Sequence, residues 1–345
     1  MRPALKAGLL PVWRDRDTLQ IGIDPRYAIA LSGIGGAAAV IGLLDGSRDW
    51  AQIIETAEGR GIPAEAAQRV LGLLAAAGAL TDFPGRTLAA LPAGLRARLA
   101  PELATASLAY RDGDGGARTL ARRRAAFIRV HGGGRVGSCV ASLLAATGIG
   151  HVACQDSEIT RPQDLTPAGL CLSDLDLPRA HGVARAIRRI APDVRTDDDG
   201  ARPDLVVFTE IRDPGTAAAL VRERVPHLAA SAAEAVGVVG PLVSPGRSAC
   251  LRCLDLAKAE RDPAWPLILA QVAGSRLDPQ ACDTVLAAAV AALAAAQAVA
   301  FIDTARPLPA VTNGTLELAA GDWQWRRRSW RPHPHCTCGA CGLQR

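Results

Sequence analysis

Hydrophobic and polar positions divide the chain into three stretches. In residues 1–83, apolar and polar side chains alternate over residues 18–23 and 27–31, and the intervening Asp-Pro-Arg at 24–26 is typical of a hairpin turn. Three segments with helical spacing of apolar residues follow, and the last covers residues 64–77. This order predicts a small winged-helix-like α+β domain. Its sheet edge would lie beside a helix, which suits the binding of an extended peptide as an added strand.

The second stretch, residues 84–126, has a weaker pattern and is predicted to be a linker or helical bridge. It contains a Pro-Gly break, a modest Leu/Ala/Arg helical segment and an Asp/Gly-rich loop at residues 111–116. We interpret the arginine run at residues 122–124 as the solvated end of a helix. A phosphate-steering cluster is the alternative interpretation.

The third stretch opens with a short apolar strand, a glycine-rich turn, an Ala/Leu-rich helix and a second strand, all within residues 127–156. The turn has the pattern Gly132-x-Gly134-x-x-Gly137, and Asp156 ends the second strand. Such glycines allow close approach of the backbone to phosphates, and the helix that follows presents free N–H groups to negative charge. The order therefore predicts the first half of a dinucleotide-binding fold.

Further apolar segments extend this domain to the C-terminus. The runs at residues 203–208 and 236–243 are typical of strands buried on both faces of a sheet, and residues 284–301 predict a buried helix. Residues 127–345 are therefore predicted to form one Rossmann-like α/β domain.

Composition and charge exclude several classes of protein. A length of 345 residues favours about two domains. The net charge is +5, and arginine supplies nearly all of the positive charge. Because aromatic residues are few, this charge does not indicate nucleic-acid binding. No apolar run approaches the ~20 residues that span a bilayer, and the N-terminus does not resemble a signal peptide. We expect a cytoplasmic protein with no membrane partner, whose nine cysteines are thiols or metal ligands.

Two Cys-x-x-Cys pairs carry the clearest chemical signal. Cys250 and Cys253 form the first, and Cys338 and Cys341 form the second. Four thiolates hold structural zinc in tetrahedral geometry and leave no position for a catalytic water. A redox pair is the alternative, but two such pairs together favour zinc. Weaker candidate ligands lie nearby: His333, His335 and Cys336.

The N-terminal pattern resembles the precursor-recognition element of pathways that modify ribosomally made peptides, which is related to the peptide chaperone PqqD. In that family the leader peptide pairs with the third strand and packs against the third helix. The resemblance implies a peptide site on these two elements, formed by Tyr27, Ala28, Ile29, Ala30, Leu31, Gln68, Arg69 and Gly72. A dimerisation or purely packing domain is the alternative.

From about residue 127 onward, the glycine turn with two distant cysteine pairs resembles the ThiF/MoeB branch of the ubiquitin-activating-enzyme superfamily. Members adenylate a carboxylate with ATP and magnesium, usually as homodimers. With the recognition element in front, the whole chain is similar to the ThiF-like partner proteins of azoline-forming (TOMM) pathways. The resemblance implies a nucleotide site formed by Gly132, Gly134, Gly137, Gln155, Asp156, Arg179 and Glu210.

Several positions depart from the pattern of the active family members. Gln155 and Ser157 align with the acidic pair that holds the ribose, and Arg179 replaces a lysine. The magnesium-binding aspartate is replaced by Glu210 or lost at Ile211, and the usual phosphate-binding arginine is absent after Asp164. Arginine and lysine are not freely interchangeable at a phosphate. We therefore expect that ATP turnover has been lost.

These observations together predict a leader-peptide-binding partner that presents a precursor to a YcaO-type cyclodehydratase. An active ATP-dependent adenylyltransferase acting on a peptide or sulfur-carrier carboxylate is the main alternative. A nicotinamide oxidoreductase is a weaker one, because it would have no role for the cysteine pairs or the peptide-recognition layout.

Overall fold

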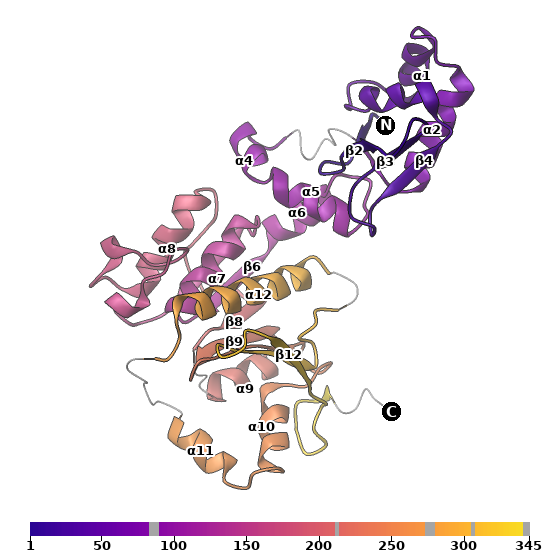
Figure 1. Cartoon of the computed structure of the whole chain (residues 1–345). Helices are drawn as coiled ribbons and strands as arrows, with labels where there is room; N and C mark the ends of the chain where they lie inside the picture. Colours follow the sequence, from indigo (N-terminus) through magenta and orange to yellow (C-terminus); the bar gives the residue numbers. More distant parts are fainter. Residues whose placement is uncertain (83–89, 211–213, 273–279, 305–307, 341–345) are drawn as a thin grey trace. The chain divides into compact units, whose positions relative to one another are not determined.

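The structure is a computed structural model and describes residues 1–82, 90–210, 214–272, 280–304 and 308–340. The chain divides into two compact units, Met1–Ala121 and Arg122–Arg345. Figure 1 shows the first unit from indigo to magenta and the second from magenta to yellow. Each unit has its own hydrophobic core.

Two small antiparallel sheets form the strand part of the first unit. The first sheet pairs β1 (Pro3–Leu5) with β5 (Leu80–Asp82). The second has the order β2-β3-β4 and consists of β2 (Pro11–Trp13), β3 (Thr18–Ile21) and β4 (Ile29–Ser32). In the described residues β4 therefore has a strand neighbour on one side only.

The turn between β3 and β4 is longer than the predicted hairpin. The carbonyl oxygen of Asp24 accepts hydrogen bonds from the backbone N–H groups of Tyr27 and Ala28 at 2.9 and 2.8 Å. These bonds close a turn around residues 24–28. Tyr27 and Ala28 consequently lie in the turn, and the strand begins at Ile29.

The helices of the first unit follow the predicted order. They are the 3₁₀ helix η1 (Gly35–Leu43), α1 (Trp50–Glu58), α2 (Ala64–Ala76), α4 (Ala93–Arg98), α5 (Ala100–Ala109) and α6 (Ala117–Ala125). Asp49 and Gln52 form a capping box that fixes the start of α1. The predicted bridge is largely helical, and α6 crosses the division between the units. The core joins sheet and helices through fully buried residues such as Ile21, Ile53 and Leu71.

A seven-stranded sheet with the order β12-β11-β10-β9-β8-β6-β7 forms the centre of the second unit. Strands β7, β6, β8 and β9 are parallel, and the remaining pairs are antiparallel. The strands are β6 (Phe127–His131), β7 (His151–Gln155), β8 (Leu205–Phe208), β9 (His227–Ala233), β10 (Val236–Val243), β11 (Gly314–Ala319) and β12 (Trp325–Ser329). This arrangement confirms the predicted α/β, Rossmann-like domain.

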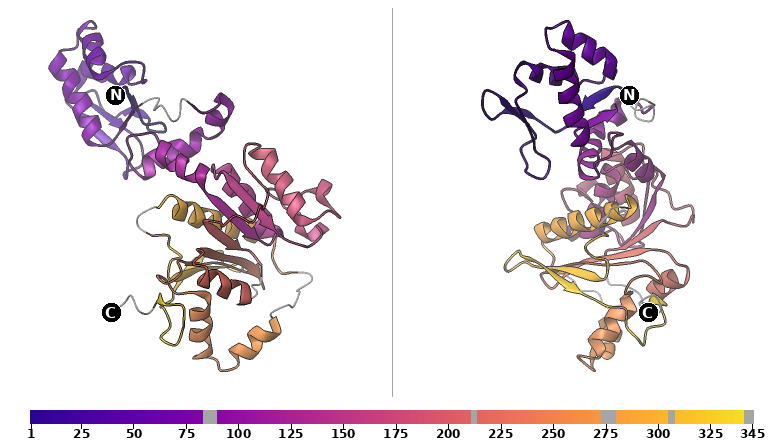
Figure 2. Two further views of the ribbon diagram at one scale, coloured as in Figure 1. Left: turned by 180° about the vertical axis from the view of Figure 1, so that it is seen from behind. Right: turned by 90° about the vertical axis from the view of Figure 1, so that its right-hand side faces the viewer.

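Helices cover both faces of this sheet (Figure 2). The alternation along β8 shows the two layers: Leu205 and Val207 face the main core, whereas Val206 and Phe208 pack against Leu220 on the other face. The helices are α7 (Arg135–Ala146), α8 (Arg179–Ile190), α9 (Pro214–Arg222), α10 (Leu251–Ala259), α11 (Trp265–Val272) and α12 (Thr284–Ile302). Helices α7 and α12 belong to the main core, and α9 packs on the opposite face.

Helix α12 corrects one expectation from the sequence. It has 19 residues and a mean hydropathy of 2.3, so by length and composition alone it is long and apolar enough to cross a membrane. The expectation that no apolar run approaches that length was therefore wrong. In the structure Leu286, Val290 and Ala294 are fully buried in the main core. This burial is that of a core helix, which is apolar because neighbouring elements surround it.

Candidate functional site

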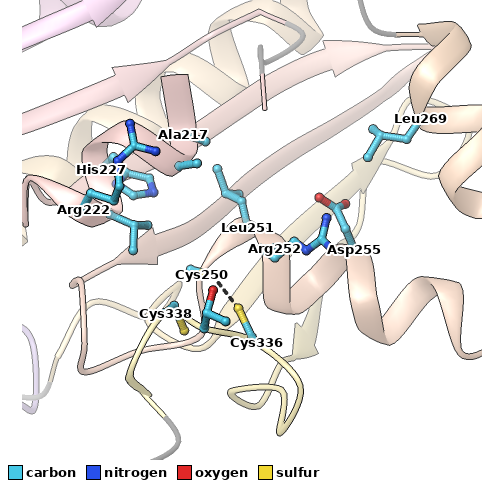
Figure 3. Close-up of a pocket in the computed structure, with 13 residues that line it drawn as sticks. Ala217, Arg222, His227, Cys250, Leu251, Arg252, Asp255, Leu269, Cys336 and Cys338 are labelled. Carbon is cyan, nitrogen blue, oxygen red and sulfur yellow. Dashed lines mark hydrogen bonds between the residues drawn. The ribbon is translucent and has the colours of Figure 1, made fainter. Parts of the chain in front are cut away.

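Four cysteines from two distant segments meet in the second unit. Cys250 caps the start of α10 and Cys253 lies in its first turn, whereas Cys336 and Cys338 belong to the segment after β12. Figure 3 shows Cys250, Cys336 and Cys338 gathered at one end of a pocket. All four sulfur atoms lie within 4.8 Å of one another. This cluster can hold a metal ion.

The sulfur–sulfur distances of the cluster match a tetrahedral zinc site. Sγ of Cys250 lies 3.7 Å from that of Cys253 and 3.6 Å from that of Cys336, and Cys253 and Cys338 are 3.6 Å apart. A tetrahedron with zinc–sulfur bonds of about 2.3 Å requires separations of about 3.8 Å. The hydrogen bond from the Cys250 thiol lowers the pKa of Cys253, whereas the same hydrogen bond raises the pKa of Cys250 and burial raises the pKa of Cys336. The cluster therefore fits the ligand set that zinc prefers.

The segment after β12 is tied to the body of the unit by two contacts just before Cys336. The indole N–H of Trp330 donates to Oγ1 of Thr315 at 3.1 Å, and His333 Nε2 lies 2.9 Å from a carboxylate oxygen of Glu260. Cys336, which the sequence ranked below Cys341, is one of the four clustered cysteines. The predicted ligand Cys341 lies outside the described residues.

The glycine turn lies between β6 and α7, as predicted. Gly132 has a φ of +94°, a conformation that favours glycine, and a Cβ atom at Gly137 would lie 1.8 Å from the carbonyl oxygen of Gly132. These two glycines are therefore required by the turn itself. The backbone N–H of Gly133 donates to Oδ2 of Asp156 at 2.6 Å. The Asp156 carboxylate thus accepts the hydrogen bond of a loop N–H that could otherwise bind a phosphate.

Arg179, at the start of α8, is surrounded by carboxylates. Its Nε and Nη2 donate to the two oxygens of Asp164 at 2.9 and 2.8 Å. Its Nη1 lies 3.4 Å from Glu210 and 3.5 Å from Asp156. Burial opposes its charge, but the hydrogen-bonded Asp164 raises the pKa of Arg179 above its usual value. The guanidinium is therefore held by the protein's own acidic side chains.

The cavity beside the turn is acidic. Its volume is about 460 Å³, and its lining includes Asp156, Glu158 and Glu210. Among the described residues that line it, none carries a positive charge. Burial, and then the neighbouring Asp156, raises the pKa of Glu210, as expected where carboxylates crowd together. As arranged here, these residues do not fit the triphosphate of ATP.

The predicted nucleotide-site residues come together at this edge of the sheet. Gln155 is the last residue of β7, so the first acidic residues after the strand are Asp156 and Glu158. An acid-x-acid pattern therefore follows the strand one position later than the sequence alignment placed it. Ile211, the other candidate for the magnesium position, lies outside the described residues.

The predicted peptide site in the first unit contains a strand edge that no other described strand pairs with. The register pairs Leu19 with Leu31, and the backbone N–H of Gly33 donates to Asp17. On the other edge of β3, toward β2, the Thr18 carbonyl accepts a hydrogen bond from the Arg14 N–H, and the Gly22 N–H donates to the Leu10 carbonyl. Because bonding alternates along antiparallel strands, the N–H and C=O groups of Ala30 and Ser32 in β4 point away from β3. These groups are available to pair with an added strand.

Helix α2 lies beside this edge. Gln68, Arg69 and Gly72 are exposed on its surface, as a binding face requires. The Arg69 side chain donates to the carbonyl oxygen of Gly33 at 2.7 Å and so ties the helix to the end of β4. The exposed Leu73 adds an apolar position to the same helix, although its neighbour Leu74 is fully buried.

A comparison with protein families places this geometry in context. The ThiF family profile matches residues 110–203, which include the glycine turn, β7 and α8. A comparison with the curated proteins returns no match.

Solved structures with the same fold cover nearly the whole chain. Escherichia coli MccB, solved with AMPCPP and MccA, has a TM-score of 0.73 at 15% identity and covers 99% of this chain and 100% of its own. MccB with ATP has a TM-score of 0.70 at 16% identity, with coverages of 98% and 99%. PaaA has a TM-score of 0.70 at 14% identity, with coverages of 94% and 98%. These matches confirm the predicted ThiF/MoeB-like fold.

Proposed function

We propose that this chain binds the leader segment of a ribosomally made precursor peptide without adenylating it. The bound peptide would be presented to a separate YcaO-type cyclodehydratase that forms azolines. Tethering raises the local concentration of the peptide at the enzyme without any bond being made on this chain. The protein would act in the cytoplasm as a homodimer.

The observation that carries this proposal is the free edge of β4 beside α2. The outward-pointing backbone groups of Ala30 and Ser32 can hydrogen-bond to an extended peptide, and the exposed face of α2 can contact its side chains. MccB, a microcin C7 biosynthetic enzyme, was solved in complex with N-formylated MccA, and it matches 98% of this chain, including the first unit. The comparison supports a peptide substrate but not its identity. We also propose that the first unit is related to winged-helix domains.

The carboxylates around Arg179 support the non-catalytic part of the proposal. A phosphate would have to displace Asp164 from the guanidinium and Asp156 from the Gly133 N–H. It would also enter a cavity lined by three carboxylates. Like charges in a partly buried site repel strongly, so ATP binding is unfavourable in this arrangement.

Zinc is the metal we propose for the cysteine cluster. With four thiolates from Cys250, Cys253, Cys336 and Cys338, no ligand position remains for substrate, so the metal would be structural. It would link the C-terminal segment to α10, and such sites can contribute on the order of 10 kcal/mol to folding.

Peptide selection followed by a variant of the strand edge tests the proposal without knowledge of the precursor. Random peptides of about 15 residues would be selected by mRNA display on the immobilised full-length protein, and one enriched peptide would be labelled for fluorescence anisotropy. Ala30→Pro removes an outward N–H and places a ring at the edge, so we expect binding to weaken by about ten-fold or more.

Ala30→Val is the matched control. It keeps the N–H and favours strand geometry, so its affinity should stay within about two-fold of the wild type. Calorimetric titration of the zinc-loaded protein with ATP and magnesium should show no saturable binding at micromolar concentration. Equal peptide affinity in Ala30→Pro and wild-type protein, or failure to enrich any peptide, would refute strand addition at β4.

An ATP-dependent adenylyltransferase is the second candidate. The acid-x-acid pair Asp156 and Glu158 and the match to MccB solved with ATP favour it, because carboxylates at this edge could hold magnesium. Saturable ATP binding together with peptide-dependent ATP–pyrophosphate exchange would establish this candidate over the first.

A further inference from the structure

A small cavity lies at the end of the β4 edge. It has a volume of about 150 Å³, which is room for a few water molecules or the end of one side chain. Its walls come from the turn before β4 (Tyr27 and Ala28), the start of β4 (Ile29) and the residues just after α2 (Ala77 and Gly78). A strand added along β4 would therefore pass its mouth.

Lys6 lines this cavity and is almost completely buried, with 2% of its surface exposed. Its ammonium donates to the carbonyl oxygen of Ser107 at 2.8 Å. Within the described part of the chain, no other acceptor is hydrogen-bonded to this ammonium, which has three N–H donors. A buried ammonium with one acceptor can gain substantially from a further negatively charged partner.

Two arginines join Lys6 in the lining. Arg26 and Arg111 are exposed, and the Arg111 guanidinium donates to the carbonyl oxygen of Arg26 at 3.2 Å. Arg26 is paired with Asp24, so its charge is partly offset.

The charge around Lys6 is only partly compensated. Burial lowers the pKa of the Lys6 ammonium, Asp112 and Asp114 act in the opposite direction, and Arg111 lowers it further. The net direction is downward, so the protein's own acidic groups do not fully offset the cost of burying this charge. No carboxylate lines the cavity itself among the described residues.

We infer that this cavity binds a carboxylate side chain, an aspartate or glutamate, of the peptide that pairs with β4. The inference rests on the proposed function and adds a specificity determinant to it. Backbone pairing along an edge strand is largely independent of sequence, whereas a buried ammonium beside the edge distinguishes an acidic residue from its amide. Leader segments that bind this protein would therefore carry an acidic residue at one fixed position of the added strand.

The peptides selected by mRNA display also provide the test. We expect the enriched peptides to share an aspartate or glutamate at a fixed register. Replacing that residue by its amide in a synthetic, C-terminally amidated peptide should weaken anisotropy-measured binding to the wild type by about ten-fold or more. The same replacement should change binding by less than about two-fold in Lys6→Met, because the buried ammonium is then gone. In Arg111→Gln the effect should be smaller than in the wild type, because one of the three cations that line the cavity is removed.

Arg60→Gln is the matched control, since it removes an exposed positive charge in the turn after α1, outside the cavity lining. In this variant the acid-to-amide effect should remain as large as in the wild type. Arg111→Gln changes an exposed residue, so it still tests the inference if Lys6→Met does not fold.

The outcomes separate this inference from the proposed function. Peptides that bind in a way sensitive to Ala30→Pro, but without a shared acid or with equal amide effects in all variants, would overturn the inference and leave strand addition standing. Binding that depends on a free C-terminal carboxylate would also overturn it, because the cavity would then hold the peptide terminus. Failure to enrich any peptide would refute both.

Discussion

Replacing Arg179 by leucine tests whether its guanidinium belongs to the fold or awaits a phosphate. Arg179 and Asp164 expose only 13% and 7% of their side chains and are joined by two hydrogen bonds. Removing one partner of a buried ion pair costs about 3–5 kcal/mol, because the other charge stays buried without compensation. Asp164 keeps a hydrogen bond from the backbone N–H of Arg161, so we expect a loss near the lower limit, about 3 kcal/mol.

The double variant Arg179→Leu/Asp164→Asn should recover about half of this loss or more. The amide oxygen of asparagine can still accept the hydrogen bond from Arg161, while the uncompensated negative charge is gone. A recovery of this size means that the two substitutions are not additive, which shows that Arg179 and Asp164 interact directly.

Urea-induced unfolding followed by tryptophan fluorescence measures these free energies. Trp13→Phe and Trp50→Phe would be introduced in every variant so that the signal comes from the second unit alone. The tryptophans that remain are Trp265, Trp323, Trp325 and Trp330. If the transition of this unit is two-state, the change in midpoint at constant slope gives the change in unfolding free energy.

Arg326→Gln is the control, because Arg326 and Asp322 form an ion pair in which both side chains are exposed. We expect no measurable loss of stability there, since exposed pairs contribute little. A loss below about 1 kcal/mol in Arg179→Leu, with no recovery in the double variant, would refute the conclusion that Arg179 is held by the fold.

The other predictions concern the metal cluster, the acidic cavity and the glycine turn. Cys336→Ser should lower the zinc content measured by mass spectrometry and the melting temperature, whereas Cys171→Ser should change neither; unchanged zinc in Cys336→Ser would argue against this ligand. Glu210 has a raised pKa, through burial and then a neighbouring carboxylate, so its contribution to stability is present below its unfolded pKa of about 4.3 and is lost as the pH rises through the folded pKa. Glu210→Gln should therefore raise the unfolding free energy slightly at pH 7, and this advantage over the wild type should shrink or reverse as the pH falls to about 4. Denaturation of both proteins at several pH values measures this difference. A difference that does not change with pH would mean that the carboxyl is fully solvated. Gly137→Ala should sharply reduce the soluble yield and melting temperature because its Cβ would overlap a backbone oxygen, whereas Gly134→Ala meets only ordinary contacts and should be mild; similar melting temperatures would contradict this account of the turn.

Local patterns were sufficient to predict how the second unit begins. The glycine spacing between two apolar runs specifies strand, turn and helix through backbone sterics and burial, both of which act over a few neighbouring residues. The structure confirms this order over residues 127–155. Strands β9, β11 and β12 were not predicted. Strand β9 consists mostly of alanine, which has a low strand propensity. Strand β11 is only partly buried and β12 is exposed and rich in arginine, so neither shows a strong apolar pattern.

For the candidate site, the sequence predicted the types of residue better than it predicted which residues contact one another. The sequence indicated that cysteines from the middle and from the C-terminal end of the second unit would meet, but the place of Cys336 in the cluster depends on how the C-terminal segment returns to α10. Similarly, Arg179 stood at an expected position, but its contacts with Asp164 and Asp156 join segments that are far apart in the chain. A spacing rule contains no information about such contacts.

The sequence by itself determined the α/β class, the glycine turn and the presence of thiolate ligands, because these depend on local sterics, periodicity and side-chain chemistry. Only the tertiary structure decided that Cys336 lies in the cysteine cluster, that Arg179 is neutralised by its neighbours, and which backbone groups of β4 point outward. These features depend on strand register and on contacts between distant segments, which the packing of the whole core selects.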